Sequence, residues 1–502
     1  MNQQKPVGEM KRLVSLVDRG AADSIFYPQD AESTVFQPDF KAYHNFTQET
    51  IELPYTGAAT WGQRITFTLP FPWLGDCLNW LAIRFQPTSW LPGDVQQGLQ
   101  QSVPRRWSYN DIPNTWTWAN ALGSSAIALV EMEVNGLVIE RWSGDWIEVW
   151  QRLYLDPSRS ASWKDSIVGT ADTVDNPYGA TFFDAPNELI NTATFNTNKT
   201  VLPTEDGQVY SFFPFWFARR RNAAFPLASI EGNSVRFHIT FRQFSEVVRR
   251  VSVPRTCDET MLGTSIVLTS NDISIPEQYT ANLSSTVPNF NDAVLVCGFT
   301  QLDGDLRKAY IQNPHECLIE PVLNIPFTEP LKYLSSTTDA DTITVSLPLE
   351  AVNGPVREVV WFLRRKAAYK FNSWTNYGAY LENEIDPIYK PQRPLLTRAV
   401  LRVGAVVWAD EEELWWRARG ALNHTGGVQV YNSYVYAYNF ADKPAQFGPS
   451  GSMNATRAEM RLDLTVSQPA GVDDKEWEVQ VFVLTHNWMR FQNGMAEVLF
   501  RD

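Results

Sequence analysis

The sequence predicts an all-β protein made of two tandem antiparallel sandwich domains with few short helices. Three observations lead to this prediction. Many segments alternate between apolar and polar residues, the same order of strands and loops occurs twice along the chain, and signals for helices are rare. With 502 residues, the chain is also longer than a single hydrophobic core usually supports.

The alternation identifies individual strands. Val235–Phe241 and Trp477–Val481 place apolar side chains on one face and polar side chains on the other. This pattern is typical of half-buried strands in antiparallel sheets. Asn135-Gly136 lies between two apolar runs and predicts a tight hairpin, because these residue types accept the positive φ angles of such a turn.

Helix signals are confined to two places. Ser143 or Asp145 is expected to cap a short helix that extends to Leu153. A second short helix is predicted for residues 305–312, because Asn313-Pro314 would stop it.

An internal repeat relates the two halves of the chain. Thr66–Pro70 and Leu78–Arg84 form a strand, a proline loop and a Trp-bearing strand that ends in arginine, and Thr344–Pro348 and Val359–Arg364 repeat this order. In each half, an aromatic strand, a proline-containing loop and an alternating strand then follow. The spacings differ between the halves, which indicates a divergent duplication and not a short-period solenoid.

The repeat sets the predicted domains. We expect an N-terminal arm at residues 1–30, a first sandwich domain with long loops at 31–253 and a second at 254–502. The first domain carries two irregular insertions, the Trp-rich segment Pro87–Asn120 and the polar segment Pro157–Glu205. Loops of this length in a compact domain are usually functional surfaces or disordered, and we interpret them as contact loops.

Charge and aromatic content narrow the possible functions. The net charge of −14 disfavours a surface that binds nucleic acid directly. Two basic clusters, Arg219–Arg221 and Arg364–Lys366, each follow a strand pattern, so we interpret them as solvated strand ends, with a nucleic-acid site as the alternative. The 19 Trp residues fit either large cores or an extensive protein interface.

The sequence contains no recognisable catalytic, cofactor-binding or metal-binding motif, so we predict no such site and no cofactor. The four cysteines form no CxxC pair, and the five histidines show no metal-ligand spacing. Free thiols in a reducing compartment are the simplest expectation for Cys77, Cys257, Cys297 and Cys317. No apolar run is long enough to cross a bilayer.

An enzymatic or carbohydrate-binding alternative stays open at this point. Trp116 and Trp118 in a long loop, together with the carboxylates Asp145 and Glu148, would suit a carbohydrate-active β-sandwich enzyme or a lectin. Capping for Asp145 and solvation for the acidic run Glu411–Glu413 are the simpler interpretations. An amidase of two jelly rolls is a third possibility, with no residues to support it.

The ordered series of short motifs resembles the major capsid proteins of nucleocytoplasmic large DNA viruses, the group of iridoviruses, chloroviruses and marseilleviruses. The resemblance runs nearly from end to end, and it departs from the family at Met453, where a cysteine is usual. The motifs, in chain order, are Leu13–Val17 with Gly20–Asp23, Phe40–Ile51, Gly144–Trp146, Phe215–Phe217 with Arg219 and Pro226-Leu227, Asn313–Glu316 with Leu318–Glu320, Gly448–Asn454 and Asn493–Met495.

This resemblance implies a fold of two eight-stranded jelly rolls and a structural function without catalysis. It implies homotrimers that form pseudo-hexagonal capsomers and tile the icosahedral capsid of a virion assembled in the host cytoplasm. The partners it implies are neighbouring capsomers, minor capsid proteins beneath the shell and, through the N-terminal arm, the inner membrane. Gly448–Gly451 is expected to form a tight loop with unusual backbone angles.

Overall fold

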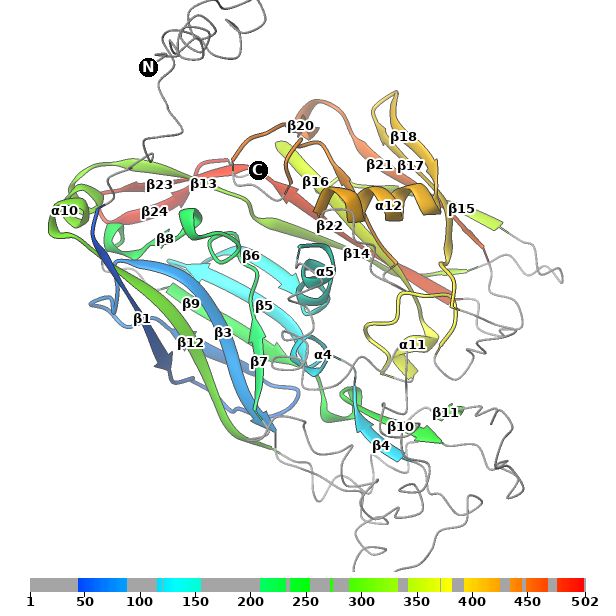
Figure 1. Ribbon diagram of the computed structural model, residues 1–502, viewed down its shortest axis with the longest axis horizontal. Coiled ribbons are helices and arrows are strands. Elements are labelled where there is room, and N and C mark those ends of the chain that lie inside the picture. The colour runs from blue at the N-terminus through cyan, green and yellow to red at the C-terminus, as the bar shows by residue number, and fades with distance from the viewer. Residues whose placement is uncertain are drawn as a thin grey trace, which may run out of the picture. The chain divides into compact units, whose positions relative to one another are not determined.

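Strands predominate among the described residues in both halves of the chain, as the computed structural model in Figure 1 shows. Residues 46–502 form one compact unit, and the predicted arm at 1–30 lies outside the described residues. The described residues are 44–87, 115–119, 121–154, 208–231, 235–252, 271–273, 289–332, 342–370, 372–381, 392–424, 434–444, 448–467 and 476–500.

Eight strands form the first jelly roll, in two antiparallel sheets with the orders β1-β12-β3-β7 and β2-β9-β5-β6. Each sheet therefore alternates strands from distant parts of the chain, as a jelly roll requires. Their bounds are β1 (Phe46–Leu53), β2 (Arg64–Thr68), β3 (Cys77–Pro87), β5 (Ile127–Val134), β6 (Leu137–Ser143), β7 (Val209–Phe212), β9 (Val235–Phe241) and β12 (Phe290–Leu302).

The second jelly roll repeats this arrangement strand for strand. Its sheets have the orders β14-β22-β16-β19 and β15-β21-β17-β18, so the predicted duplication and the two eight-stranded jelly rolls are confirmed. The bounds are β14 (Val322–Lys332), β15 (Thr342–Pro348), β16 (Pro355–Arg365), β17 (Leu396–Val403), β18 (Val406–Glu412), β19 (Val435–Asn439), β21 (Met460–Ser467) and β22 (Glu476–Thr485).

The strand pairing places the end of the first jelly roll later than the predicted boundary between residues 253 and 254. Strand β12 follows that boundary, yet it pairs along its length with both β1 and β3 and is the eighth strand of the first jelly roll. We therefore propose Leu302 as the end of the first jelly roll.

Three long connections of the first jelly roll have one of their ends at the same end of its β3 sheet. Pro87 at the end of β3 is opposite Phe290 at the start of β12, and Phe85 is opposite Val209 at the start of β7. A small sheet of β4 (Thr115–Trp118), β10 (Val248–Ser252) and β11 (Asn271–Ile273) joins two of these connections. The first insertion that the sequence singled out therefore leaves from this end of the jelly roll, and the chain returns to the same end after the second.

The predicted turn and helices are present. Asn135 and Gly136 have φ angles of 58° and 81°, as the hairpin between β5 and β6 requires. Gly448 and Gly451 also have positive φ, as expected for their loop. The helices are α4 (Leu122–Ser125), α5 (Asp145–Tyr154), α10 (Gly304–Gln312), α11 (Ala367–Lys370) and α12 (Glu413–His424).

Short elements complete the described fold. A three-stranded sheet with the order β13-β23-β24 lies outside the two jelly rolls, and two-residue strands extend the sheets at β3 and β16. The bounds are β8 (Phe225–Pro226), β13 (His315–Ile319), β20 (Met453–Asn454), β23 (Asn487–Gln492), β24 (Met495–Val498), η4 (Arg221–Ala223), η5 (Leu227–Ser229), η6 (Phe244–Glu246) and η8 (Ala455–Arg457).

The two jelly rolls are joined and share one hydrophobic core. A parallel bridge between Arg141 of β6 and Leu323 of β14 links one sheet of each jelly roll into a nine-stranded sheet. One cluster of buried apolar residues runs through both halves. Strand β22, predicted from Trp477–Val481 to be half-buried, is buried on both faces, because the first jelly roll covers its outer side.

Candidate functional site

The contact between the two jelly rolls is the most elaborate polar site in the described part of the molecule. We call it the junction: helix α5 with strand β6 of the first jelly roll, against β14, β16 and β22 of the second. Trp146 of α5 is fully buried there, with its ring centroid 5.0 Å from that of Phe482 on β22. Helix α5 of the first jelly roll therefore covers part of the outer face of the second.

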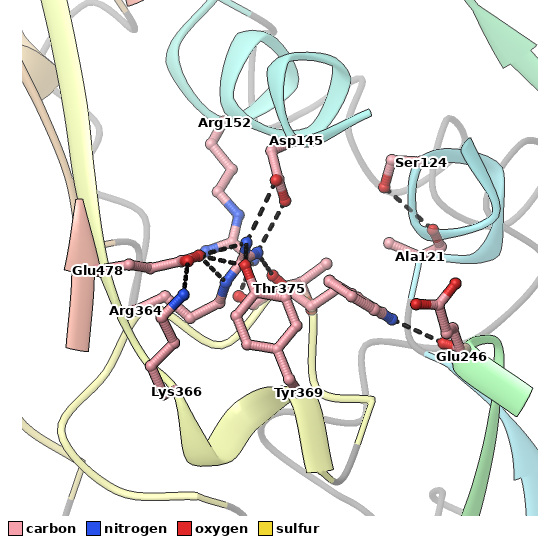
Figure 2. Close-up of polar contacts among 11 residues, drawn as sticks. Ala121, Ser124, Asp145, Arg152, Glu246, Arg364, Lys366, Tyr369, Thr375 and Glu478 are labelled. Atoms are coloured by element: carbon pink, nitrogen blue, oxygen red, sulfur yellow. Dashed lines mark hydrogen bonds and ion pairs between the residues drawn. The ribbon is translucent and has the colours of Figure 1, made fainter. Parts of the chain in front are cut away.

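Arg364, near the end of β16, is the centre of the junction (Figure 2). Its guanidinium donates to both carboxylate oxygens of Asp145 at 2.8 and 3.3 Å, and to Oε1 of Glu478 at 2.8 and 3.1 Å. Tyr369 and Lys366 donate to Glu478 at 2.5 and 2.9 Å. The side chains of Arg364 and Glu478 are 1% and 0% exposed. Their charges are therefore balanced by the other charged groups of the cluster and not by water.

The pKa shifts at this cluster favour its charged state. Burial opposes ionisation of Asp145, but Arg364 and Arg242 outweigh it, and the pKa of the Asp145 carboxyl falls below its ordinary value. Glu478 follows the same balance, with burial opposed by Arg364, and its pKa is also lowered. In turn, Asp145 outweighs burial and holds the pKa of Arg364 well above its usual value.

A second buried cluster joins the halves at Glu320, which follows β13. Arg220 of the first jelly roll donates to its Oε2 at 2.8 Å, Arg357 of β16 donates to the same oxygen, and Arg219 donates to its main-chain carbonyl. Glu320 and Arg357 have side-chain exposures of 2% and 1%. Three cations from two halves therefore converge on one residue.

A third group connects α5, β16 and α12. Tyr154 at the end of α5 donates to Glu358 of β16, and Nε2 of His424 lies 2.5 Å from the other oxygen of that carboxylate. Nδ1 of His424 lies 2.8 Å from the carbonyl oxygen of Gly420, so both ring nitrogens face acceptors. Burial opposes the charge of His424, but Glu358 outweighs it and the pKa of His424 is raised.

One further carboxylate bridges the two jelly rolls at the sheet itself. Glu140 of β6 is 2% exposed, and its Oε1 accepts a hydrogen bond of 3.1 Å from the main-chain nitrogen of Val322 on β14. Burial raises the pKa of Glu140 to about 7, although Arg219 lowers it in part. This carboxyl group therefore titrates near neutral pH in the folded protein.

The structure corrects several interpretations of single residues. Asp145 is the first residue of α5, but its carboxylate binds Arg364 and is therefore committed to the junction. The basic clusters are not solvated strand ends: Arg364 and Arg365 are buried, and Arg219 and Arg220 bind Glu320. Their charges are therefore used inside the chain.

The acidic run differs from the simpler expectation at one residue, whereas the tryptophans agree with theirs. Glu411 and Glu412 are exposed, but Glu413 is buried at the start of α12 and pairs with Arg417 at 2.9 Å. Five Trp side chains are fully buried within the chain, which supports the interpretation as core. They are Trp142, Trp146, Trp361, Trp416 and Trp477.

The alternative carbohydrate site is not assembled around Asp145. Glu148 pairs with Arg152 at 2.7 Å, and Asp145 is 7% exposed beside Arg364, so neither carboxylate faces an open cleft. Trp116 and Trp118 lie on β4, which pairs with β10. The polar contacts at the junction therefore serve to hold one jelly roll against the other.

The thiols carry no reactive character in the described residues. Cys77, Cys297 and Cys317 are free, and burial raises the pKa of Cys77 to about 12. Cys257 lies outside the described residues. Among the described residues, no group of three or more His, Cys, Asp and Glu side chains is placed to hold a metal ion. No described helix is long and apolar enough to cross a membrane.

Sequence reasoning missed the junction as a site. The sequence showed only that the repeated Trp-bearing strand ends in an arginine, Arg364, and this was the one signal that pointed to the site. Its partners, Asp145 and Glu478, lie 219 and 114 residues away. Only the packing of α5 onto β16 and β22 brings these side chains together.

Two family models match this chain. Residues 34–284 match the major capsid protein N-terminus, and residues 307–497 match the large eukaryotic DNA virus major capsid protein. Among curated relatives, the major capsid protein of Pyramimonas orientalis virus is 22% identical over 98% of this chain and 99% of its own length. That of Chrysochromulina ericina virus is 26% identical over 70% of this chain, but the match spans only 57% of the relative.

Solved structures show the same fold at low sequence identity. The VP54 protein of PBCV-1 has a TM-score of 0.62 at 17% identity, with 93% of this chain and all of VP54 covered. The Faustovirus major capsid protein has a TM-score of 0.58 at 12% identity, over 96% and 97% of the two chains. From its two matched halves and its two jelly rolls, the chain belongs to the family of large eukaryotic DNA virus major capsid proteins.

Proposed function

We propose that this protein is a structural subunit of an icosahedral virus shell and assembles as a homotrimer that presents six jelly rolls. The observation that carries the proposal is the strand-for-strand repetition of one jelly roll in a single chain. Three such chains around a threefold axis have a nearly sixfold outline, and that outline tiles a surface without gaps. Closure of the trimer requires head-to-tail contacts repeated around the axis.

The junction supports this function because a shell subunit has to be rigid. A hinge between the jelly rolls would let the outline of a capsomer vary, and the pairs Arg364–Asp145 and Arg220–Glu320 hold the two halves in one arrangement. Every carboxylate of the junction is bound by a partner in the chain, so the site is suited to holding geometry and not to turning over a substrate.

The partners and location belong to the same proposal. The protein would reside in the virion capsid after assembly in the host cytoplasm, next to neighbouring capsomers. Residues 1–30 would contact minor capsid proteins beneath the shell or the inner membrane. Contact with nucleic acid is not part of the proposal, because the net charge of −14 repels phosphate backbones.

The test is the mass and shape of the purified full-length protein. Native mass spectrometry and light scattering should give three times the 57.1 kDa of one chain, and electron microscopy should show a hexagonal outline. A protein that stays monomeric from low to high micromolar concentration, in low and physiological salt, would contradict the trimer. Hydrolysis of a glycan by the same preparation would contradict the purely structural function.

A further inference from the structure

Two edges of the described sheets correspond to the edges that are joined inside the chain. At the junction, the edge strand β6 of the first jelly roll meets the edge strand β14 of the second. By the repeat, β18 is the counterpart of β6 and β1 is the counterpart of β14. Both β1 and β18 end their sheets, and each pairs with one neighbouring strand in the described residues.

The match between β18 and β6 extends to local detail. Each strand follows a tight hairpin, and each hairpin has a register shift, between Met132 and Glu133 in the first jelly roll and between Leu401 and Arg402 in the second. Each strand also leads directly into a helix, α5 after β6 and α12 after β18. Strand β18 is exposed along its length except at Ala409, whereas long exposed edges are normally covered or paired.

Helix α12 presents an apolar stripe that nothing in the described chain covers. Leu414, Ala418 and Leu422 are spaced by four residues and lie on one face of the helix, and all three are exposed. Leu414 and Leu422 are 61% and 65% exposed. The corresponding helix α5 instead buries Trp146 against the second jelly roll. The stripe therefore has the character of a docking face.

The receiving face is on the first jelly roll. The outer side of β3 and β7 borders a hollow of about 330 Å³ whose aromatic wall includes Trp80 of β3, Trp150 of α5 and Phe212 of β7, with Gln48 of β1 at its border. Trp80 lies across Gly298 of β12, where an added Cβ would come within 2.1 Å of the indole nitrogen. This hollow occupies the face that corresponds to the one that α5 covers on the second jelly roll.

We propose that β18 and α12 of one copy dock onto β1 and the aromatic hollow of the next copy, as β6 and α5 dock onto β14, β22 and β16 within the chain. This inference rests on the proposed trimer and names its interface. The occupant is a second copy because the chain itself supplies both halves of the contact in a head-to-tail arrangement. Three copies then repeat one kind of contact six times around the ring, three times within chains and three times between them.

The first experiment removes the stripe without disturbing the core. The double variant Leu414→Glu with Leu422→Glu changes only exposed side chains, so its circular dichroism should match that of the parent protein. Its trimer should dissociate at concentrations at least about tenfold higher than the parent's, because buried apolar anchors dominate such interfaces. The matched control is Leu137→Glu with Val138→Glu, at the exposed tip of β6, which should remain trimeric.

The second experiment locates the contact. Leu422→Cys combined with Gln48→Cys should give covalently linked trimers with a short bismaleimide, whereas the parent and Leu422→Cys alone should not. If the Leu414→Glu, Leu422→Glu variant stays trimeric like the parent and the double-cysteine variant gives no crosslink, this interface is wrong. The proposed trimer itself would not be contradicted by that result. A parent protein that is monomeric throughout would overturn both the interface and the proposed trimer.

Discussion

The outer faces of the two equivalent sheets differ in what covers them, although the strands have the same order. Arg364 of β16 and Arg84 of β3 both lie near the end of the repeated Trp-bearing strand. Arg364 is 1% exposed between buried carboxylates, whereas Arg84 is 17% exposed and pairs with Glu52 and Asp292, each about half exposed. The arginine near the end of this strand therefore fixes a domain contact in one half and forms a more exposed ion pair in the other.

The largest expected effect is at Arg364. Arg364→Ala would leave Asp145 and Glu478 buried without their main cation, and loss of one partner of a buried ion pair costs about 3–5 kcal/mol. We expect a decrease of this size in the free energy of unfolding, measured with urea and followed by tryptophan fluorescence.

The counterpart Arg84→Ala tests whether burial is the cause. Water can solvate Glu52 and Asp292 after the change, so we expect a loss of about 1 kcal/mol or less. Equal losses at Arg84 and Arg364 would mean that the junction does not distinguish the two jelly rolls energetically.

A pH dependence near neutrality is expected from Glu140. The folded state favours the protonated carboxyl of Glu140, so its contribution to the free energy of unfolding is full below the ordinary carboxyl range and is lost as pH rises through about 7. The difference is at most about 3 kcal/mol, from 1.36 kcal/mol per pKa unit.

The raised pKa of His424 adds a loss in the same direction as pH rises. Urea midpoints measured from pH 5 to pH 8 should therefore decrease, and Glu140→Gln should flatten this slope. If the urea midpoint of Glu140→Gln falls with pH as steeply as that of the parent, other groups cause the pH dependence. His424→Gln is then the next variant to measure.

A smaller effect is expected at Tyr154, which reaches from α5 to Glu358. Tyr154→Phe removes one donor to a buried carboxylate and keeps the ring, and a hydrogen bond to a charged group contributes about 1.5–3 kcal/mol. The urea midpoint should decrease accordingly. Tyr438→Phe, in the second jelly roll, is the aromatic control and should change little.

The smallest effects compare the two hairpins that precede α5 and α12. Gly136 and Gly404 have φ angles of 81° and 57°, which side chains with a Cβ adopt at a cost of about 1 kcal/mol. Gly136→Ala and Gly404→Ala should each lower the free energy of unfolding by this amount. A clearly larger loss at one site would show that the two hairpins are not equivalent.

The sequence by itself determined the local structure and the duplication. Alternation identified β9 at Val235–Phe241 with its observed bounds, and Asn135-Gly136 identified the hairpin, because these signals depend only on neighbours along the chain. The repeated order of strands predicted two sandwich domains for the same reason, since each half carries its own pattern, and the family resemblance implied that these domains are jelly rolls.

Only the tertiary structure decided where the halves meet and which charges are buried. The alternation of Trp477–Val481 indicated one apolar face, yet both faces of β22 are buried because α5 and its jelly roll pack on the polar side. Arg364 could be seen in the sequence as a strand end, but Asp145 and Glu478 reach it across 219 and 114 residues. Alternation along the chain shows which face of a strand packs inside its own sandwich. Whether the other face is also buried depends on a neighbouring domain, and sequence spacing does not encode that contact.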